Sequence, residues 1–523
     1  MSRGGRAGAL LAALCFATTG EPPPAPERLL LERKLEVQQV FTRTPLTEAL
    51  LDRLAEEEAT IARCRAAGDA EQELAALTRA AQSLDGREEQ PWRALRGALV
   101  ARPERHLVDA AGRLSVRFEW LFPPDPLPTE PCTLRLELAS AAPLALGAPP
   151  QRIALLAERA HERLSATTPP APLEGEIDLA RTGSFVLLAS VVTADGVRHP
   201  LDHTAPLAVT DGLAARVAAL EARRRALVDA RRDATSSPAT AGSAPALARA
   251  LEVAALPADL LVRITEGART LAESLLEVEL ARASELLDAV ERGAPPPLNR
   301  GFERCVVRLP STGELVPWLL FVPERDDATS DAAPAAPAPA PPLLVALHGL
   351  GVREESWLRY GGGALEREAR ARGCVVALPS GWRADSFYVG PGEEAVLAVI
   401  DAACARVAID PDRIALIGHS MGGFGALRIA GRNAARFAAV ASIAGAGRPS
   451  WLDGFAELPT LLVHGDADEV VPVALSRNLA RIAKVRGLPW RYWELAGARH
   501  VEVVAQALPE VLDFCLAARR AAR

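Results

Sequence analysis

The sequence predicts an α/β fold for the C-terminal part of the chain, with a doubly wound and mostly parallel sheet, preceded by helical segments and a small antiparallel β-sandwich-like domain. Three observations predict it. Short, wholly apolar runs such as 343–347 and 414–417 suit central parallel strands, which are buried on both faces. Apolar residues with period two between 114 and 122 suit half-buried antiparallel strands. Leucines at helical spacing, for example between 276 and 287, suit amphipathic helices.

The helical segments have recognisable ends. Thr44 suits an N-cap and Gly68 a C-terminal cap, so we expect one helix between them. Asp69 can cap a second helix. Helical patterning returns after Asp211 and stops at Gly293, where a proline run prevents its continuation.

The strands are less regular. Asp195-Gly196 follows the apolar run 185–192 and predicts a hairpin turn. The run 152–156 fits a strand or a helix equally well. Two stretches rich in alanine and proline, 234–245 and 326–342, predict a flexible connection and a disordered surface loop.

The most informative motif is a pentapeptide centred on Ser420. Gly418 and Gly422 flank it, a buried strand run precedes it, and a small-residue helix pattern follows. A sharp strand-to-helix turn pushes a serine hydroxyl out of the backbone, where a histidine can reach it. The context therefore predicts a nucleophile elbow.

Its partners follow in the order serine, acid, histidine. Asp468 lies on a loop after a buried strand, and His500 lies on a small-residue loop after the next strand. We expect His500 to be the base and Asp468 the orienting acid. Asp466, two residues earlier, is an alternative acid.

An oxyanion hole is expected beside the serine. The strand run 343–347 leads into His348-Gly349-Leu350-Gly351. We expect the backbone N–H groups of Met421 and Leu350 to donate to the oxyanion.

Residues from about 300 to 519 resemble an α/β-hydrolase of the prolyl-oligopeptidase, dienelactone-hydrolase and polyhydroxybutyrate-depolymerase-like esterase group. The matching pieces are 347–349, 410–414, 418–423, 464–468 and 497–500. The resemblance implies a serine hydrolase and favours Asp468 over Asp466 as the acid. One departure is Leu350, where depolymerase-like esterases often carry a cysteine.

The boundaries follow from these patterns and the resemblance. We expect a signal peptide at 1–20, a helical segment at 21–105, a β-sandwich-like domain at 106–210, a helical segment with a flexible linker at 211–297, and the α/β-hydrolase catalytic domain at 298–523.

Net charge and hydropathy indicate which kinds of partner and cellular location to expect. The net charge of −7 gives no basic surplus to neutralise phosphates, so a nucleic-acid partner is not expected. A short apolar stretch after Arg3 and Arg6 predicts an export signal and a secreted or periplasmic protein, whereas Cys15 is a poor lipoprotein site after the bulky Leu14. No transmembrane span is expected.

Several other residues have a structural interpretation. We expect three further histidines, at strand ends or beside Ser420, to tie neighbouring loops together. Trp382 and Tyr388 suit either a substrate pocket or core packing. Cys374 and Cys404 lie in apolar runs and are expected to fill the core, without a disulfide framework or metal pattern. The three histidines are His348, His419 and His464.

The sequence therefore predicts a serine hydrolase that cleaves a small or polymeric carboxylic ester through an acyl-enzyme on Ser420. No metal or organic cofactor is implied. A serine peptidase of the prolyl-oligopeptidase type is the alternative, although no propeller repeat precedes residue 300. In a third hypothesis the first 300 residues bind a polysaccharide or cell surface, with the hydrolase as an accessory.

Overall fold

The computed structural model describes residues 48–520 except 85–91, 110–111, 123, 125–126, 141–150, 166–167, 178–181, 235–243, 270, 295, 297, 324–338 and 384–385. The predicted signal peptide and the greater part of both flexible stretches lie outside the described residues. The chain forms two compact units. Unit 1 comprises the residues up to Ala219 and Leu260–Val278, and unit 2 comprises Leu220–Asp259 and Glu279–Arg523.

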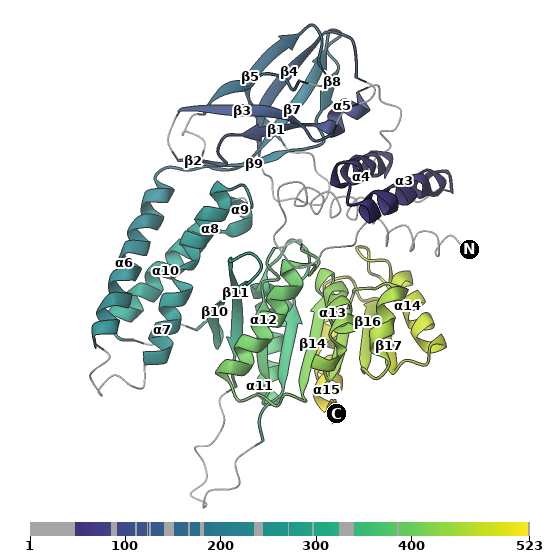
Figure 1. Ribbon diagram of the computed structural model, residues 1–523. Helices are drawn as coiled ribbons and strands as arrows, with labels where there is room; N and C mark the ends of the chain where they lie inside the picture. The colour runs from purple at the N-terminus through teal and green to yellow at the C-terminus, as the bar shows by residue number, and fades with distance from the viewer. Residues whose placement is uncertain are drawn as a thin grey trace, which may run out of the picture. The chain divides into compact units, whose positions relative to one another are not determined.

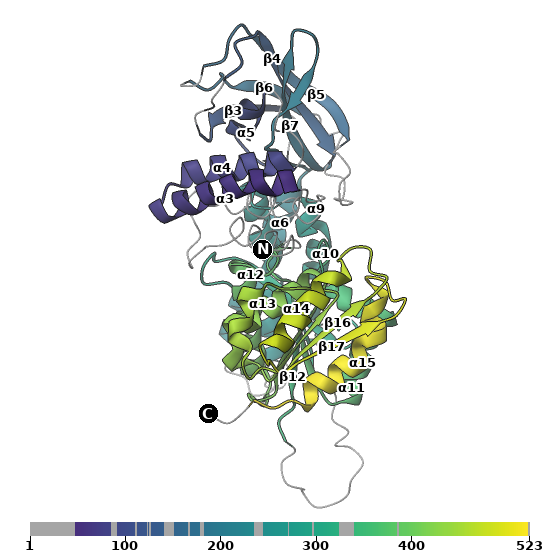
Figure 2. The ribbon, with the colours of Figure 1, turned by 90° about the vertical axis from the view of Figure 1, so that its right-hand side faces the viewer.

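The described part of unit 1 starts with the helices α3 (Glu48–Ala67), α4 (Ala70–Leu84) and α5 (Arg93–Ala98). Gly68 ends α3 with a φ of 71°, a conformation that glycine adopts without strain. The Asp69 carboxylate accepts the Gln72 N–H at 3.1 Å and caps α4. Both caps confirm the sequence expectation, and Figure 2 shows the two helices lying side by side.

Two antiparallel sheets follow, in the orders β1-β3-β6 and β2-β9-β7-β4-β5, with β8 paired to β7 and β2 parallel to β9. Their inward-facing residues share one core, as in a sandwich. The strands are β1 (Leu99–Pro103), β2 (Leu107–Val108), β3 (Gly112–Trp120), β4 (Cys132–Ser140), β5 (Arg152–His161), β6 (Leu173–Ile177), β7 (Gly183–Thr193), β8 (Arg198–Pro200) and β9 (Ala205–Val209).

The predicted hairpin joins β7 to β8. Gly196 has a φ of 83°, and its N–H donates to the Thr193 carbonyl at 2.9 Å. The ambiguous run 152–156 belongs to the strand β5. Two register shifts in its pairing with β4 interrupt the alternation, which is why its sequence also fitted a helix.

Five helices connect the sandwich to the second sheet. They are α6 (Leu213–Ala234), α7 (Ala244–Val253), α8 (Leu256–Thr265), α9 (Leu271–Ser274) and α10 (Leu276–Glu291). Asp109 caps α6 by accepting the backbone N–H groups of Leu213 and Ala214, both at 2.9 Å. Gly293 ends α10 with a φ of 63°. The N–H of Gly293 bonds to the carbonyl of Val290, which is a common C-terminal cap.

Unit 2 contains an eight-stranded sheet of order β10-β11-β13-β12-β14-β15-β16-β17 (Figure 1). The pairs from β13 to β17 are parallel, and β10 and β11 extend the sheet in antiparallel fashion. The strands are β10 (Phe302–Arg308), β11 (Leu315–Phe321), β12 (Leu343–Leu347), β13 (Val375–Pro379), β14 (Ile414–His419), β15 (Ala439–Ile443), β16 (Thr460–Gly465) and β17 (Trp490–Leu495).

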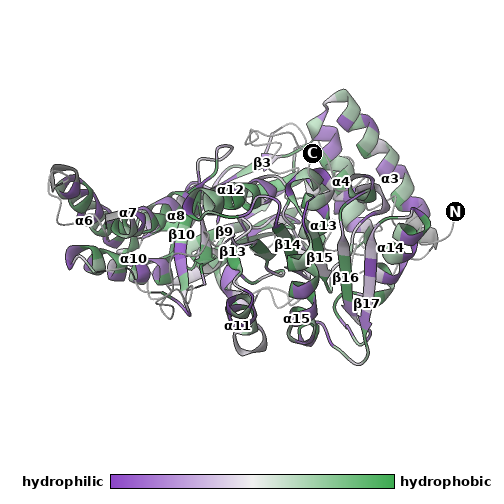
Figure 3. Cartoon of the chain, turned by 90° about the horizontal axis from the view of Figure 1, so that it is seen from below, coloured by the Kyte–Doolittle hydropathy of each residue, from purple (hydrophilic) through white to green (hydrophobic). Residues whose placement is uncertain are grey.

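The strand order reverses between β12 and β14, so their carboxyl ends adjoin where ligands usually bind in open α/β sheets. Helices cover both faces, and each face has its own apolar core (Figure 3). One face carries α11 (Ala364–Ala371) and α15 (Glu502–Ala517), and the other carries α12 (Pro391–Arg406), α13 (Met421–Arg432) and α14 (Val473–Val485). No helix in the described ranges is long and apolar enough to cross a membrane.

The two cysteines expected to fill the core differ in their burial. Cys374 is buried as expected, and burial raises the pKa of its thiol to about 12. Cys404 is exposed, which corrects the expectation of a core position. On α12 the buried stripe includes Ile400 and Ala403, and the next residue turns about 100° away from it.

Candidate active site

Ser420 lies at the carboxyl end of β14, at the start of α13. Its φ of 55° and ψ of −120° fall outside the regions that non-glycine residues prefer. The strained turn presents the side chain at the head of the sheet, with 8% of the residue exposed. The N-terminus of α13 faces the same point and favours negative charge there.

Glycines make this turn possible because backbone atoms occupy the space of their missing side chains. A Cβ atom at Gly418 would lie 2.0 Å from the Gly422 carbonyl oxygen. A Cβ atom at Gly422 would lie 2.2 Å from the Leu347 carbonyl oxygen. Real Cβ atoms do not approach so closely, so both flanking positions of the pentapeptide require glycine in this backbone.

Ser420, His500 and Asp468 form one chain of hydrogen bonds. Nε2 of His500 lies 3.0 Å from Oγ of Ser420, and Nδ1 of His500 lies 2.7 Å from Oδ2 of Asp468. The three side chains come from the segments after β14, β17 and β16. The structure thus brings together the three residues that the sequence singled out.

Asp468 is the carboxylate of this chain, and Asp466 is not. The Asp468 side chain is fully buried, and its Oδ1 accepts the backbone N–H groups of Val470 and Val471 at 2.8 and 2.9 Å. Burial by itself raises the pKa of this carboxyl, but hydrogen bonds from two histidines and two N–H groups hold the pKa well below its usual range. Asp466 instead accepts the Gly497 N–H at 2.6 Å.

His419 supports the loop that carries the base. Its Nε2 lies 2.8 Å from the carbonyl oxygen of His500, and its Nδ1 lies 3.1 Å from the hydroxyl of Tyr360. Burial lowers the pKa of His419 to about 4, so the ring is neutral near pH 7. A neutral ring that donates from Nε2 and accepts at Nδ1 satisfies both partners.

Leu350 lies in the turn after β12, next to Gly349, which faces the nucleophile. A Cβ atom at Gly349 would lie 3.5 Å from Cβ of Ser420, which is ordinary van der Waals contact. His348 anchors the turn because its ring nitrogens lie 2.8 Å from the Gly349 carbonyl and 2.6 Å from the Ser380 carbonyl. Burial lowers the pKa of His348.

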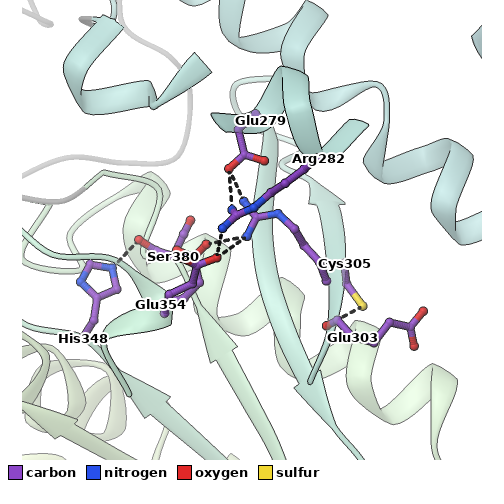
Figure 4. Close-up of polar contacts among 9 residues, drawn as sticks. Glu279, Arg282, Glu303, Cys305, His348, Glu354 and Ser380 are labelled. Atoms are coloured by element: carbon purple, nitrogen blue, oxygen red, sulfur yellow. Dashed lines mark hydrogen bonds and ion pairs between the residues drawn. The ribbon is translucent and has the colours of Figure 1, made fainter. Parts of the chain in front are cut away.

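A buried charge cluster lies next to this turn (Figure 4). Arg304 on β10 donates to Glu354 at 3.1 Å and to Glu279 on α10 at 2.5 Å. Arg282 on α10 donates to Glu279 at 3.2 Å and to Glu355 at 2.5 Å. Because Glu354 and Glu355 begin the short helix η3 (Glu354–Leu358), the cluster ties α10 to the chain just beyond Leu350.

The cluster holds charge away from water. Glu279 and Glu354 are 3% and 1% exposed. Burial keeps the pKa of Glu279 above its usual value, although both guanidinium groups lower it. Burial alone also raises the pKa of Glu354, but Arg304 and Arg353 bring that pKa below its usual range.

The aromatic residues singled out beforehand are structural. Tyr388 is fully buried, and its hydroxyl donates to the His348 carbonyl at 3.2 Å. Its ring packs on Gly425 of α13, where a Cβ atom would lie 2.5 Å from it. Trp382 is half-buried, and its Nε1 donates to Glu314 at 2.6 Å.

Three groups around the site were missed from the sequence. They are the Tyr360 hydroxyl on His419, the contact of His464 with Asp468, and the charge cluster of Glu354. Of these, only the contact of His464 has a local signal in the sequence. His464 lies near the end of β16, four residues before Asp468 on the loop that follows.

Comparisons with known proteins match a family model and several esterases. Residues 344–521 match the model of the alpha/beta hydrolase family. The putative esterase NocK of Nocardia uniformis subsp. tsuyamanensis is 35% identical over 155 residues, which are 27% of this chain and 44% of that protein. Cutinase 1 of Thermobifida cellulosilytica is 34% identical over 95 residues, or 18% of this chain and 36% of that protein.

The chain therefore spans less than half the length of these two curated relatives. A solved structure of a thermostable esterase aligns with 81% of this chain and 100% of that chain, with a TM-score of 0.37 and 16% identity. The C-terminal part of this chain, residues 344–521, is a domain of the alpha/beta hydrolase family that resembles the esterase-like serine hydrolases.

Proposed function

We propose that this protein is a serine hydrolase that cleaves carboxylic esters through an acyl-enzyme on Ser420. The observation that carries the proposal is the continuous hydrogen-bond chain from Asp468 through His500 to Ser420, whose hydroxyl sits on a strained elbow. The relatives named esterase and cutinase support an ester substrate rather than a peptide.

The contacts of His500 favour one tautomer of its neutral ring. Because the Asp468 carboxylate is ionised, it accepts a hydrogen bond from Nδ1–H of His500. The Nε2 lone pair then faces the Ser420 hydroxyl at 3.0 Å. This tautomer is the one that general-base catalysis requires.

Each step of the proposed reaction has a residue assigned to it. His500 takes the Ser420 proton as Oγ attacks the ester carbonyl, and the tetrahedral oxyanion accepts the N–H groups of Met421 and Leu350. His500 returns the proton to the leaving alkoxide, which departs as the alcohol and leaves the acyl-enzyme. Water, deprotonated by His500, attacks the acyl carbon and releases the acid together with free Ser420.

A covalent probe and a chromogenic ester test the proposal. We expect a fluorophosphonate probe to label the protein, and the protein to hydrolyse p-nitrophenyl acetate. Ser420→Ala should abolish labelling and lower kcat by about 10⁴-fold or more, because the nucleophile is lost while little core packing changes.

Ser115→Ala on β3 is the matched control and should keep both activities. A folded wild-type protein that is not labelled between about pH 6 and 9, or a Ser420→Ala variant near wild-type turnover, would overturn the proposal. Export from the cytoplasm, and binding of a polysaccharide or cell surface by the first 300 residues, stay predictions.

A further inference from the structure

A second histidine, His464, contacts the carboxylate of Asp468 in the triad. Nε2 of His464, at the end of β16, is 3.2 Å from Oδ2 of Asp468, the same oxygen that His500 contacts. The side chains of His464 and Asp468 are both 0% exposed. The mechanism above makes no use of this histidine.

The partners of the His464 ring determine where its protons can lie. Nε2 faces only acceptors, because the Val471 carbonyl oxygen lies 2.9 Å away in addition to the carboxylate. Nε2 must therefore carry a proton. Nδ1 lies 2.7 Å from Oγ of Ser476, which can either accept or donate.

The single hydroxyl proton of Ser476 decides between the two states of Nδ1. Oγ of Ser476 also lies 2.7 Å from the carbonyl oxygen of Gly445, a buried residue. If the Ser476 hydroxyl donated its hydrogen bond to Nδ1, it could no longer donate to the Gly445 carbonyl. A buried carbonyl that loses its hydrogen-bond donor is costly. If Ser476 donates to Gly445, Nδ1–H donates to Ser476 and every group is satisfied. Matching each hydrogen-bond donor with an acceptor therefore favours protons on both ring nitrogens of His464.

The surrounding charges are consistent with a cation here. Asp468 lies in contact, and its low pKa keeps it ionised. A buried charge is tolerated when it is paired and fully hydrogen-bonded. The titratable and charged groups around the ring are Asp468 on the loop after β16, His500 before α15, His419 at the end of β14, Glu494 on β17, and Arg477 on α14, which is paired with Glu494.

We propose that His464 is a cationic positioning residue, which holds Oδ2 of Asp468 in place for His500 and offsets part of the carboxylate charge felt by His500. This inference rests on the proposed function. A carboxylate beside a histidine favours the protonated ring, and a second cation on the carboxylate opposes this effect. His464 thus opposes the pull of Asp468 on a proton at His500.

The variant His464→Gln removes the charge and keeps a neutral N–H donor. Rates of p-nitrophenyl acetate hydrolysis across pH report, through kcat/KM, the group that must be unprotonated in the free enzyme. We expect the acid limb of this profile to move upward by about 1 pH unit in the variant. On the alkaline plateau we expect kcat/KM to stay within about tenfold of wild type.

The matched control is Arg499→Gln, which makes the same change of charge beside His500 in the sequence. Arg499 is 59% exposed and paired with Glu469 at 2.8 Å, so solvent screens it. We expect its acid limb to move by less than about 0.3 unit. An unmoved limb in His464→Gln, or an equal shift in both variants, would contradict the proposal.

A direct measurement uses the whole protein labelled with ¹⁵N-histidine. We expect both ring nitrogens of His464 to give signals of protonated N–H groups between about pH 6 and 8. The signals are identified by their loss in His464→Gln or, if that variant does not fold, by their displacement in Ser476→Ala. A neutral ring pattern would overturn the proposal even if the protein proved inactive, and the fluorophosphonate probe separately reports failure of the proposed function.

Discussion

Two buried polar clusters of unit 2, the Ser420–His500–Asp468 triad and the Arg304 cluster, differ in the kinds of group they contain. The triad chain starts at an ionised carboxylate, Asp468, and ends at a neutral hydroxyl, Ser420. The cluster of Arg304 pairs buried glutamates with guanidinium groups, which do not lose their protons in proteins. The histidine of the first cluster can therefore pass on a proton, whereas the guanidinium groups of the second cannot and instead hold α10, β10 and η3 together.

Because of this difference, we expect substitutions in the two clusters to affect different properties of the protein. A change in the triad chain should alter the chemical rate, because its members touch the reacting atoms. A change in the Arg304 cluster should alter stability, because removal of one partner leaves a buried charge uncompensated. The following variants test this separation.

Asp468→Asn should have the largest effect. The amide oxygen should stay on the N–H groups of Val470 and Val471, which places the donating NH2 group opposite Nδ1 of His500. His500 then adopts the wrong tautomer, and we expect kcat to fall about 10³- to 10⁴-fold. Asp466→Asn is the control two residues away and should cost less than about tenfold, since its side chain accepts only the Gly497 N–H. Steady-state kinetics on p-nitrophenyl acetate measure both, and the reverse order would make Asp466 the orienting acid.

Arg304→Met should mainly destabilise the fold. It leaves Glu279 and Glu354 buried without their central partner, and we expect a loss of about 3–5 kcal/mol in the free energy of unfolding. Arg486→Met removes an exposed pair with Asp453 and should cost less than about 1 kcal/mol. Urea denaturation measures these values. A fall in kcat of more than about tenfold while Arg304→Met is still folded would place the cluster within catalysis.

His419 should give a smaller, pH-dependent effect. Its pKa is about 4 in the folded protein, so folding is favoured above the ordinary histidine pKa and weakens as pH falls toward 4. We expect wild type to lose up to about 3 kcal/mol by this route between pH 7 and pH 4.5. Unfolding free energies at both pH values should show a smaller loss for His419→Gln. An equal loss in the two proteins would show that the ring is not held neutral.

The sequence predicted the triad because each member follows a strand and lies in a short motif. Parallel strands bring their carboxyl ends to one edge of the sheet, so residues far apart in sequence, such as Ser420 and His500, meet there. The motif alone could not decide between Asp466 and Asp468. Their side chains leave the same loop, and only the backbone geometry directs Asp468 to the base.

The Arg304 cluster could not be predicted in this way. Its members lie on α10, β10 and η3, at positions with no fixed spacing, and a single arginine in a strand carries no pattern. The sandwich was predicted where alternation was regular, as in β3, and was ambiguous at β5, where register shifts break the period. Local patterns thus specify elements, whereas partners between elements depend on how those elements pack.

The glycines around Ser420 affect how a mutational scan of this protein should be interpreted. Gly423 and Gly445 face each other so closely that a Cβ atom at Gly445 would lie 2.8 Å from Cα of Gly423. Together with Gly418 and Gly422 they form a contiguous set of positions where even alanine should be rejected. Such a scan would mark these four positions as strongly as the triad, although none of their side chains takes part in a chemical step. Intolerance to substitution near the elbow therefore reports the closeness of two backbones as much as it reports catalysis.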